Sequence, residues 1–287
     1  MNLRPPPGIR YAGPFKASTL GEWSAETPAD ADEVVIDMSK AAFIDSMGLA
    51  TIAAVAEDAA NCGRALRFIE PQHHAVRTYM SRMHLDDCLR QYFCSGVTLP
   101  KVNERDTGHR LFELQRFDTN GGDELAERVF QAMVADGSNQ ADAIEFFKGI
   151  SEVVNNVADH SGAGGGWAAM QVMPSSLGTG LINFAVADAG HGFETTLSRR
   201  YWVSGPVDAM AKAFQRTVSG TGEAGRGAGL DDLHQRIRRH QGSLTAWSGA
   251  AIGQNSGSSG PLSCRRVTAA FPGTVIYAGF KPSAKEV

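Results

Sequence analysis

Three polar residues recur at steps of four near the middle of the chain: Glu152, Asn156 and His160. On an α-helix a step of four advances about 400°, so these side chains lie within an arc of about 80° on one face. The opposite side of the segment is apolar, with Val153 and Val157 among its residues. The polar face therefore either meets solvent, which is the common case for such a pattern, or lines a polar pocket.

A second group of residues follows the apolar segment 181–187, which the pattern predicts to be a strand. Asp188, Gly190 and Gly192 come as the chain leaves the sheet. A carboxylate there could accept a hydrogen bond from an exocyclic amine, and the glycines could let a flat base approach the backbone closely. An aspartate-containing turn after a strand is the ordinary alternative.

A third group is rich in glycine and runs directly into a predicted helix over 230–240. It consists of Gly225, Arg226, Gly227 and Gly229. Glycines with free N–H groups at the start of a helix can form an anion site, because the helix dipole places partial positive charge there. Taken alone, this pattern is only suggestive.

The elements around these groups predict an α/β sandwich whose sheet is mostly antiparallel. Helices come early and strands come late, and residues 249–261 are expected to form a loop. The segments 193–224 contain short helical patterns that end in a glycine-rich stretch. Predicted strands cover 111–117, 167–173, 181–187, 243–248, 265–270 and 274–280, and predicted helices cover 123–135, 142–160 and 230–240.

The order of these motifs, completed by a strand entry at 271–274, resembles the GHKL superfamily of ATPases, which has the Bergerat α/β fold. The resemblance covers roughly residues 120–280. It implies ATP and Mg²⁺ as cofactors, with Asn156 as the Mg²⁺ ligand and Glu152 as the carboxylate that orients or deprotonates the nucleophile. It also implies that Asp188 binds the adenine amino group.

The same resemblance implies roles for the glycines in binding ATP and a lid that covers it. Gly190 and Gly192 would lie beside the adenine, and residues 193–224 would form the ATP lid. His160 would serve packing or capping. The phosphates would be bound by backbone N–H groups with added charge from one arginine: Gly225, Arg226, Gly227 and Gly229.

The N-terminal part alternates strand, helix, strand and helix, which predicts a parallel sheet. Strands are expected at 33–39 and 65–70, with a helix at 46–60 between them and residues 1–11 left unstructured. Asp45 and Ser46 stand at the start of that helix, where a capping pair is common. A phosphate on Ser46 would add about −1.5 to −2 charges near a positive helix end and change the docking surface.

Together with Gly48 and Leu49, these N-terminal residues resemble the motif of the STAS domain of anti-sigma factor antagonists. The resemblance covers about residues 12–94. The first strand of that family is poorly represented. The resemblance makes Ser46 the candidate phospho-acceptor. The predicted organisation is thus a STAS-like regulatory domain at 1–98, a linker at 99–110 and a GHKL domain at 111–287.

Composition narrows the class of protein. The chain has 27 basic and 31 acidic residues, a net charge of −4, and no expected affinity for nucleic acid. Four cysteines without metal spacing and a start without an apolar run predict a cytoplasmic protein with no membrane segment. The partner is expected to be a protein, and the family resemblance adds homodimer formation as an expectation.

Two functions follow. The first is an ATP-binding signalling protein of the anti-sigma-factor type, a serine kinase or ATPase controlled by its STAS-like domain. The second is a nucleotide-sensing scaffold that changes partner binding through lid closure without transferring phosphate. The acceptor in the first case could be Ser46 of the same chain, a serine of a partner, or water.

Overall fold

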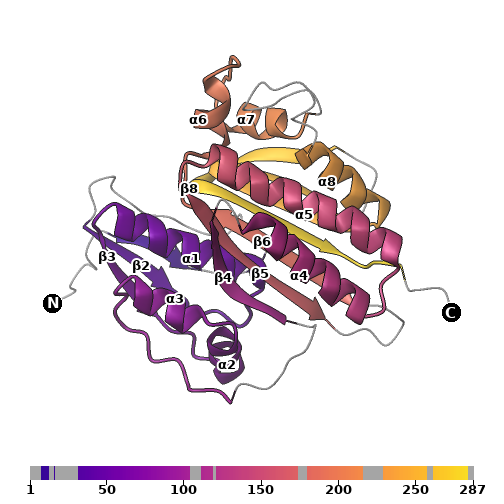
Figure 1. Cartoon of the computed structure of the whole chain (residues 1–287). Helices are drawn as coiled ribbons and strands as arrows, with labels where there is room; N and C mark the ends of the chain where they lie inside the picture. Colours follow the sequence, from indigo (N-terminus) through magenta and orange to yellow (C-terminus); the bar gives the residue numbers. More distant parts are fainter. Residues whose placement is uncertain are drawn as a thin grey trace.

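The computed structural model describes residues 8–12, 16, 32–103, 111–118, 121–173, 180–215, 229–256 and 261–283, and within them the chain builds two sheets (Figure 1). The N-terminal sheet has three parallel strands in the order β1-β2-β3. The central strand is a buried apolar run, as the sequence predicts. The elements are β1 (Gly8–Ala12), β2 (Glu33–Asp37), α1 (Ser46–Asn61), β3 (Ala65–Ile69), α2 (His74–Arg82) and α3 (Leu85–Gln91).

The C-terminal sheet has five antiparallel strands in the order β4-β5-β6-β8-β7. Three helices, α4, α5 and α8, cover one face of it (Figure 1). The mixed α/β class and the antiparallel second sheet are therefore confirmed. The elements are β4 (Leu111–Asp118), α4 (Gly122–Ala135), α5 (Gln140–His160), β5 (Gly165–Met173), β6 (Leu181–Asp188), α6 (Gly192–Ser198), α7 (Pro206–Ala213), α8 (Gly229–Arg239), β7 (Ser243–Ser256) and β8 (Ser263–Phe280).

Two predictions about the strands were wrong. Residues 8–11 are not unstructured, because β1 pairs in parallel with β2 from Gly8 opposite Glu33 onward. The expected loop at 249–261 is mostly a long hairpin: β7 continues to Ser256, and β8 is one strand where two were predicted. Pairing along the hairpin satisfies the backbone groups of this glycine-rich segment, with register shifts between 248 and 251.

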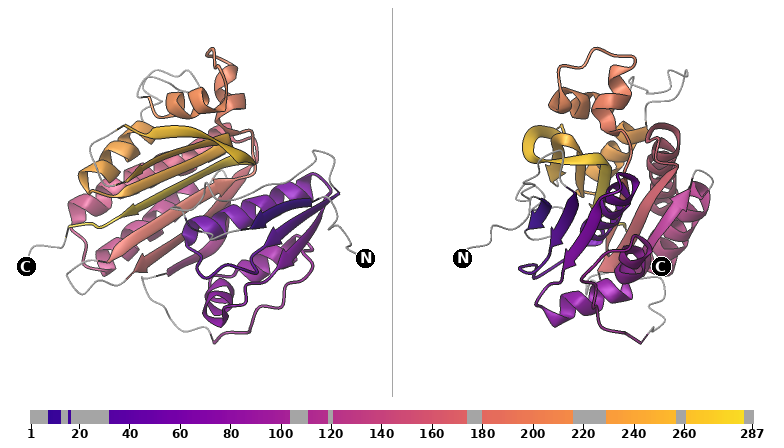
Figure 2. Two further views of the ribbon diagram at one scale, coloured as in Figure 1. Left: turned by 180° about the vertical axis from the view of Figure 1, so that it is seen from behind. Right: turned by 90° about the vertical axis from the view of Figure 1, so that its left-hand side faces the viewer.

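Helix α1 forms a layer shared by both sheets. Asp45 caps its start by accepting a hydrogen bond from the Gly48 N–H at 3.0 Å. All but three of its 16 residues are buried, which is expected only of a helix covered on every side. Figure 2 shows α1 between the small sheet and the five-stranded sheet, on the face opposite α4 and α5. The two sheets thus share one core cluster.

Polar contacts join the two parts at the end of α1. The buried carboxylate of Glu57 accepts hydrogen bonds from Arg116 on β4, at 3.2 and 2.9 Å, and from the indole N–H of Trp167 on β5, at 2.7 Å. A backbone hydrogen bond from Leu114 to the Met83 carbonyl adds a second link. The N-terminal part is therefore held firmly against the larger sheet.

We expect Glu57→Ala to lower the free energy of unfolding by about 2 kcal/mol, because it leaves Arg116 and the Trp167 indole without their buried acceptor. Urea unfolding followed by circular dichroism measures the change. Glu127→Ala, which removes an exposed glutamate bonded to Gln131 on α4, is the control, with an expected change below about 0.5 kcal/mol. Equal effects of the two variants would contradict a stabilising role for the Glu57 contacts.

Candidate functional site

Helix α5 carries the polar face predicted from the sequence. Its start is capped by Asn139, whose side-chain oxygen accepts the Ala141 N–H at 2.8 Å. Glu152 is exposed and Asn156 is half-buried, while Val153 and Val154 between them pack into the second core. His160 is the last residue of α5, and its side chain lies outside the described residues.

The structure brings Glu152 against the start of α8. An added Cβ at Gly229 would lie 2.6 Å from Oε2 and 2.9 Å from Cβ of Glu152, so the two residues are in close contact and a larger residue at 229 would require the glutamate to shift. One turn earlier on α5, an added Cβ at Gly149 would lie 3.0 Å from Cδ1 of Leu233. Two of the predicted motifs, far apart in the sequence, are therefore neighbours in space.

Asp188 ends β6 on the same face of the sheet as α5, since the even-numbered residues of β6 pack into that core. It is 2% exposed, and its Oδ1 accepts the Gly190 N–H at 2.8 Å. Burial raises the pKa of Asp188 to about 7, against backbone hydrogen bonds from Gly190 and Thr274 that favour the charged form. The nearby charge of Glu57 adds to the increase in pKa.

Gly190 and Gly192 are explained first by contacts within the protein. A Cβ at Gly190 would lie 2.0 Å from the Ser161 carbonyl oxygen, where the chain after β6 crosses the end of α5. Gly192 has φ +69°, and a Cβ there would lie 2.8 Å from Oγ of Ser248. Their placement beside an adenine remains a prediction.

The segment predicted as a lid is helical and anchored over its described part, 193–215. Helices α6 and α7 lie at one edge of the molecule (Figure 1), and Met210 and Phe214 are buried in the second core. Phe214 meets Phe193 edge to face, with ring centroids 6.4 Å apart. The remaining lid residues, 216–224, and the three phosphate-binding candidates Gly225, Arg226 and Gly227 lie outside the described residues.

Three residues at this site were missed by the sequence analysis. Ser248 accepts the Phe193 N–H at 2.8 Å and donates to the Gly273 carbonyl at 3.0 Å, which ties α6 to the hairpin. The backbone of Thr274 binds Asp188, and the strand entry at 271–274 was the available signal for it. His234, a buried residue of α8, has no hydrogen-bond partner for Nε2 among the described residues, and burial lowers its pKa.

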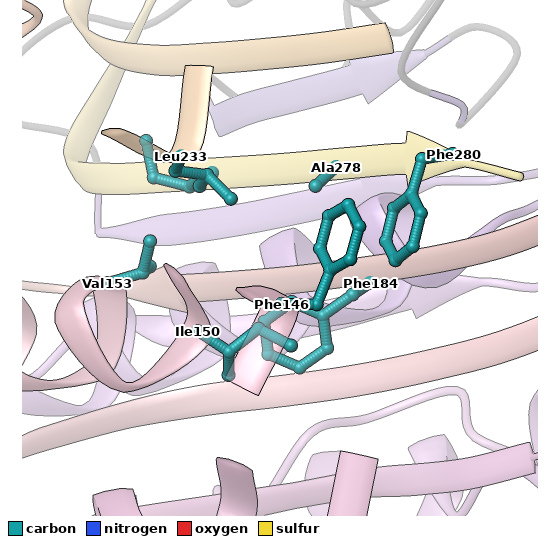
Figure 3. A pocket seen from close by; sticks show the side chains of 8 residues that line it. Phe146, Ile150, Val153, Phe184, Leu233, Ala278 and Phe280 are labelled. Carbon is teal, nitrogen blue, oxygen red and sulfur yellow. The ribbon is translucent and has the colours of Figure 1, made fainter. Parts of the chain in front are cut away.

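A cavity lies between α5, α8 and the sheet (Figure 3). Its volume is about 10 Å³, and its lining is wholly apolar. A cavity of this kind offers nothing to a phosphate or a metal ion and belongs to the core packing. The lining residues are Phe146, Ile150, Val153, Phe184, Leu233, Ile276, Ala278 and Phe280.

No group of three histidine, cysteine or acidic side chains that could hold a metal ion occurs among the described residues. Asn156 offers one amide oxygen on the face it shares with Glu152. Mg²⁺ commonly takes one or two protein ligands and completes its shell with phosphates and waters. One amide oxygen is compatible with Mg²⁺ only if phosphates and waters supply the other ligands.

Ser46 is fully buried at the start of α1. Its hydroxyl donates to the Asn183 carbonyl at 3.3 Å, on the side of the five-stranded sheet that faces α1. Asp188 and Glu152 lie on the other side. In this arrangement Ser46 is out of reach of any group bound beside Glu152, so its role as acceptor would require α1 to leave the sheet.

Comparison with known families places a STAS domain at residues 13–95. The matched segment is less than a third of the chain, and the GHKL family gives no match. No curated protein matches the sequence. STAS domains act through protein–protein contacts, and this one suggests signalling of the anti-sigma-factor antagonist kind. In the described part of the chain, every helix is too short or too polar to cross a membrane.

The buried carboxyl of Asp188 predicts that stability falls as pH rises. The unfolded chain releases this proton near its ordinary pKa of about 4 and the folded chain near 7, so between these values the folded state binds more protons. The free energy of unfolding of the wild-type chain should therefore fall by about 4 kcal/mol between pH 4 and pH 8. In Asp188→Asn this decrease should be absent. Urea unfolding at several pH values tests this. Asp123→Asn, at an exposed position of α4, should retain the slope. A wild-type slope in Asp188→Asn would mean that another group titrates.

Proposed function

We propose that this chain is an ATP- and Mg²⁺-binding signalling protein of the GHKL type, with its STAS domain as the regulatory part. The observation that carries the proposal is the contact between Glu152 on α5 and Gly229 at the start of α8, with Asp188 buried on the same side of the sheet. These residues come from motifs that are far apart in the sequence, and their placement on one side of the sheet supports a shared ligand.

Different residues of the site would bind the adenine and the phosphates of ATP. Asp188 would accept a hydrogen bond from the adenine amino group, and contact with that donor would favour its charged form. The first N–H groups of α8, at Gly229, would face the phosphates with the positive end of the helix dipole. The predicted contributions of Gly225, Arg226 and Gly227 precede this helix in the sequence and belong to the same anion site.

Asn156 and Glu152 would act at the γ-phosphate. Asn156 would hold Mg²⁺ through its amide oxygen, and the metal would offset the charge of the phosphates. Glu152, exposed one turn away, would accept the proton of an incoming hydroxyl or water and fix its direction. The chemistry then needs little beyond in-line placement of the nucleophile, so the acceptor can be a serine of a partner protein or water.

A specific observation favours the second function, a nucleotide-sensing scaffold. The candidate acceptor Ser46 is buried on the far side of the sheet from Glu152. A chain that holds its own acceptor away from the site could bind ATP to alter contacts of the STAS domain with a protein partner, without transfer. Both functions share the same binding site and differ in turnover.

ATP binding is the first test. We expect calorimetric titration with ATP and Mg²⁺ to show one site per chain, with affinity lost by at least about a hundredfold in Asp188→Ala, because the adenine amine loses its buried acceptor. Gly229→Ala should also weaken binding, since the new methyl group would crowd the start of α8, whose N–H groups are assigned to the phosphates. Asp123→Ala is the control for folded protein with unchanged affinity. Binding that survives Asp188→Ala would show that the adenine site is misplaced.

Turnover separates the two functions. With γ-labelled ATP we expect Glu152→Ala to bind ATP but to lose turnover by about 10²- to 10⁴-fold, the usual contribution of a general base. Label on the protein that persists in Ser46→Ala would exclude Ser46 as acceptor. Tight binding with no turnover in the wild-type chain would support the scaffold.

A further inference from the structure

The loop between α6 and α7 presents an exposed tryptophan. Trp202 is 81% exposed, whereas Trp167 and Trp247, the other described tryptophans, are buried. A solvent-facing indole of this size contributes nothing to the core. Figures 1 and 2 show α6 and α7 projecting at an edge of the molecule, away from α2 and α3.

The loop around Trp202 is held by hydrogen bonds. The N–H groups of Arg200 and Tyr201 donate to the Leu197 carbonyl at 3.0 and 2.9 Å. The Ser204 N–H donates to the Asp208 carboxylate at 2.8 Å, and the same carboxylate pairs with Lys212. The indole is thus presented from an ordered backbone, which reduces the entropy that binding would cost.

Two arginines precede Trp202 in the sequence by two and three positions. Arg199 and Arg200 are both exposed, and within the described residues neither has an ion-pair partner. The nearby acid Asp208 is already paired with Lys212, whose ammonium lies 5.9 Å from the centre of the Trp202 ring. Tryptophan and arginine are the residue types most enriched at energetically important interface positions.

We propose that Trp202, Arg199 and Arg200 form a docking site for an acidic segment of a partner protein. Carboxylates of the partner pair with the two guanidinium groups, and an apolar side chain between them packs on the indole. A single indole flanked by charges provides too little apolar surface for stable binding to a lipid bilayer. A protein segment can contact the indole and the guanidinium groups at the same time. The three residues lie within 193–224, the segment predicted as the ATP lid, and the test below measures docking in the absence of nucleotide.

The test uses the full chain and a fluorescein-labelled peptide of alternating glutamate and leucine, with a lysine–leucine peptide for comparison. Fluorescence anisotropy should show saturable binding of the acidic peptide alone, weakened at least about tenfold in Trp202→Ala and in the double variant Arg199→Glu/Arg200→Glu. Trp202→Phe should retain most of the affinity. Phe93→Ala, at an aromatic residue 94% exposed after α3, and Arg265→Glu/Arg266→Glu, at two exposed arginines of β8, are the matched controls.

Several results would overturn the proposal. They are the absence of saturable binding, equal binding of the basic peptide, or equal losses in the control variants. Binding to phosphatidylserine vesicles that depends on Trp202, without binding of the acidic peptide, would assign the surface to membranes instead. Circular dichroism confirms that each variant is folded, which is expected because all the changed side chains are exposed.

Discussion

The burial of α1 between two sheets is the constraint on which the rest of the molecule depends. A helix can be covered on both sides only if small residues let the layers approach, and Ala50, Ala53, Ala54 and Ala56 provide this. The STAS domain is therefore part of the core of the larger sheet, and any motion between them must expose apolar surface.

The same packing connects the electrostatics of the two parts. Glu57 comes from the STAS domain and pairs with Arg116, and it adds to the increase in the pKa of Asp188 that burial mainly causes. Both carboxylates lie beside the paired strands β5 and β6. Trp167 on β5 binds Glu57 and is opposite Ala187 on β6, which directly precedes Asp188.

Local patterns in the sequence predicted α5, β5, β6 and the parallel order of β2 and β3, because each has a clear apolar period. They failed for β1, whose five residues gain their structure only from pairing with a strand about 20 residues away. Local patterns could not predict the burial of Ser46 either. A serine at the start of a helix has the same local sequence whether the helix faces solvent or a second sheet. The order of the motifs, and not any local pattern, predicted that Glu152 and Gly229 belong to one site. No local pattern predicted the exposure of Trp202.

The position of Ser46 links modification to docking. A phosphoryl group on its hydroxyl would carry about −1.5 to −2 charges into a space now filled by β6, next to the Asn183 carbonyl, itself an acceptor. Phosphorylation and the docked position of α1 therefore exclude each other. Interactions that stabilise the docked helix, including the Glu57 contacts with Arg116 and Trp167, therefore lower the population of chains in which Ser46 is open to a kinase.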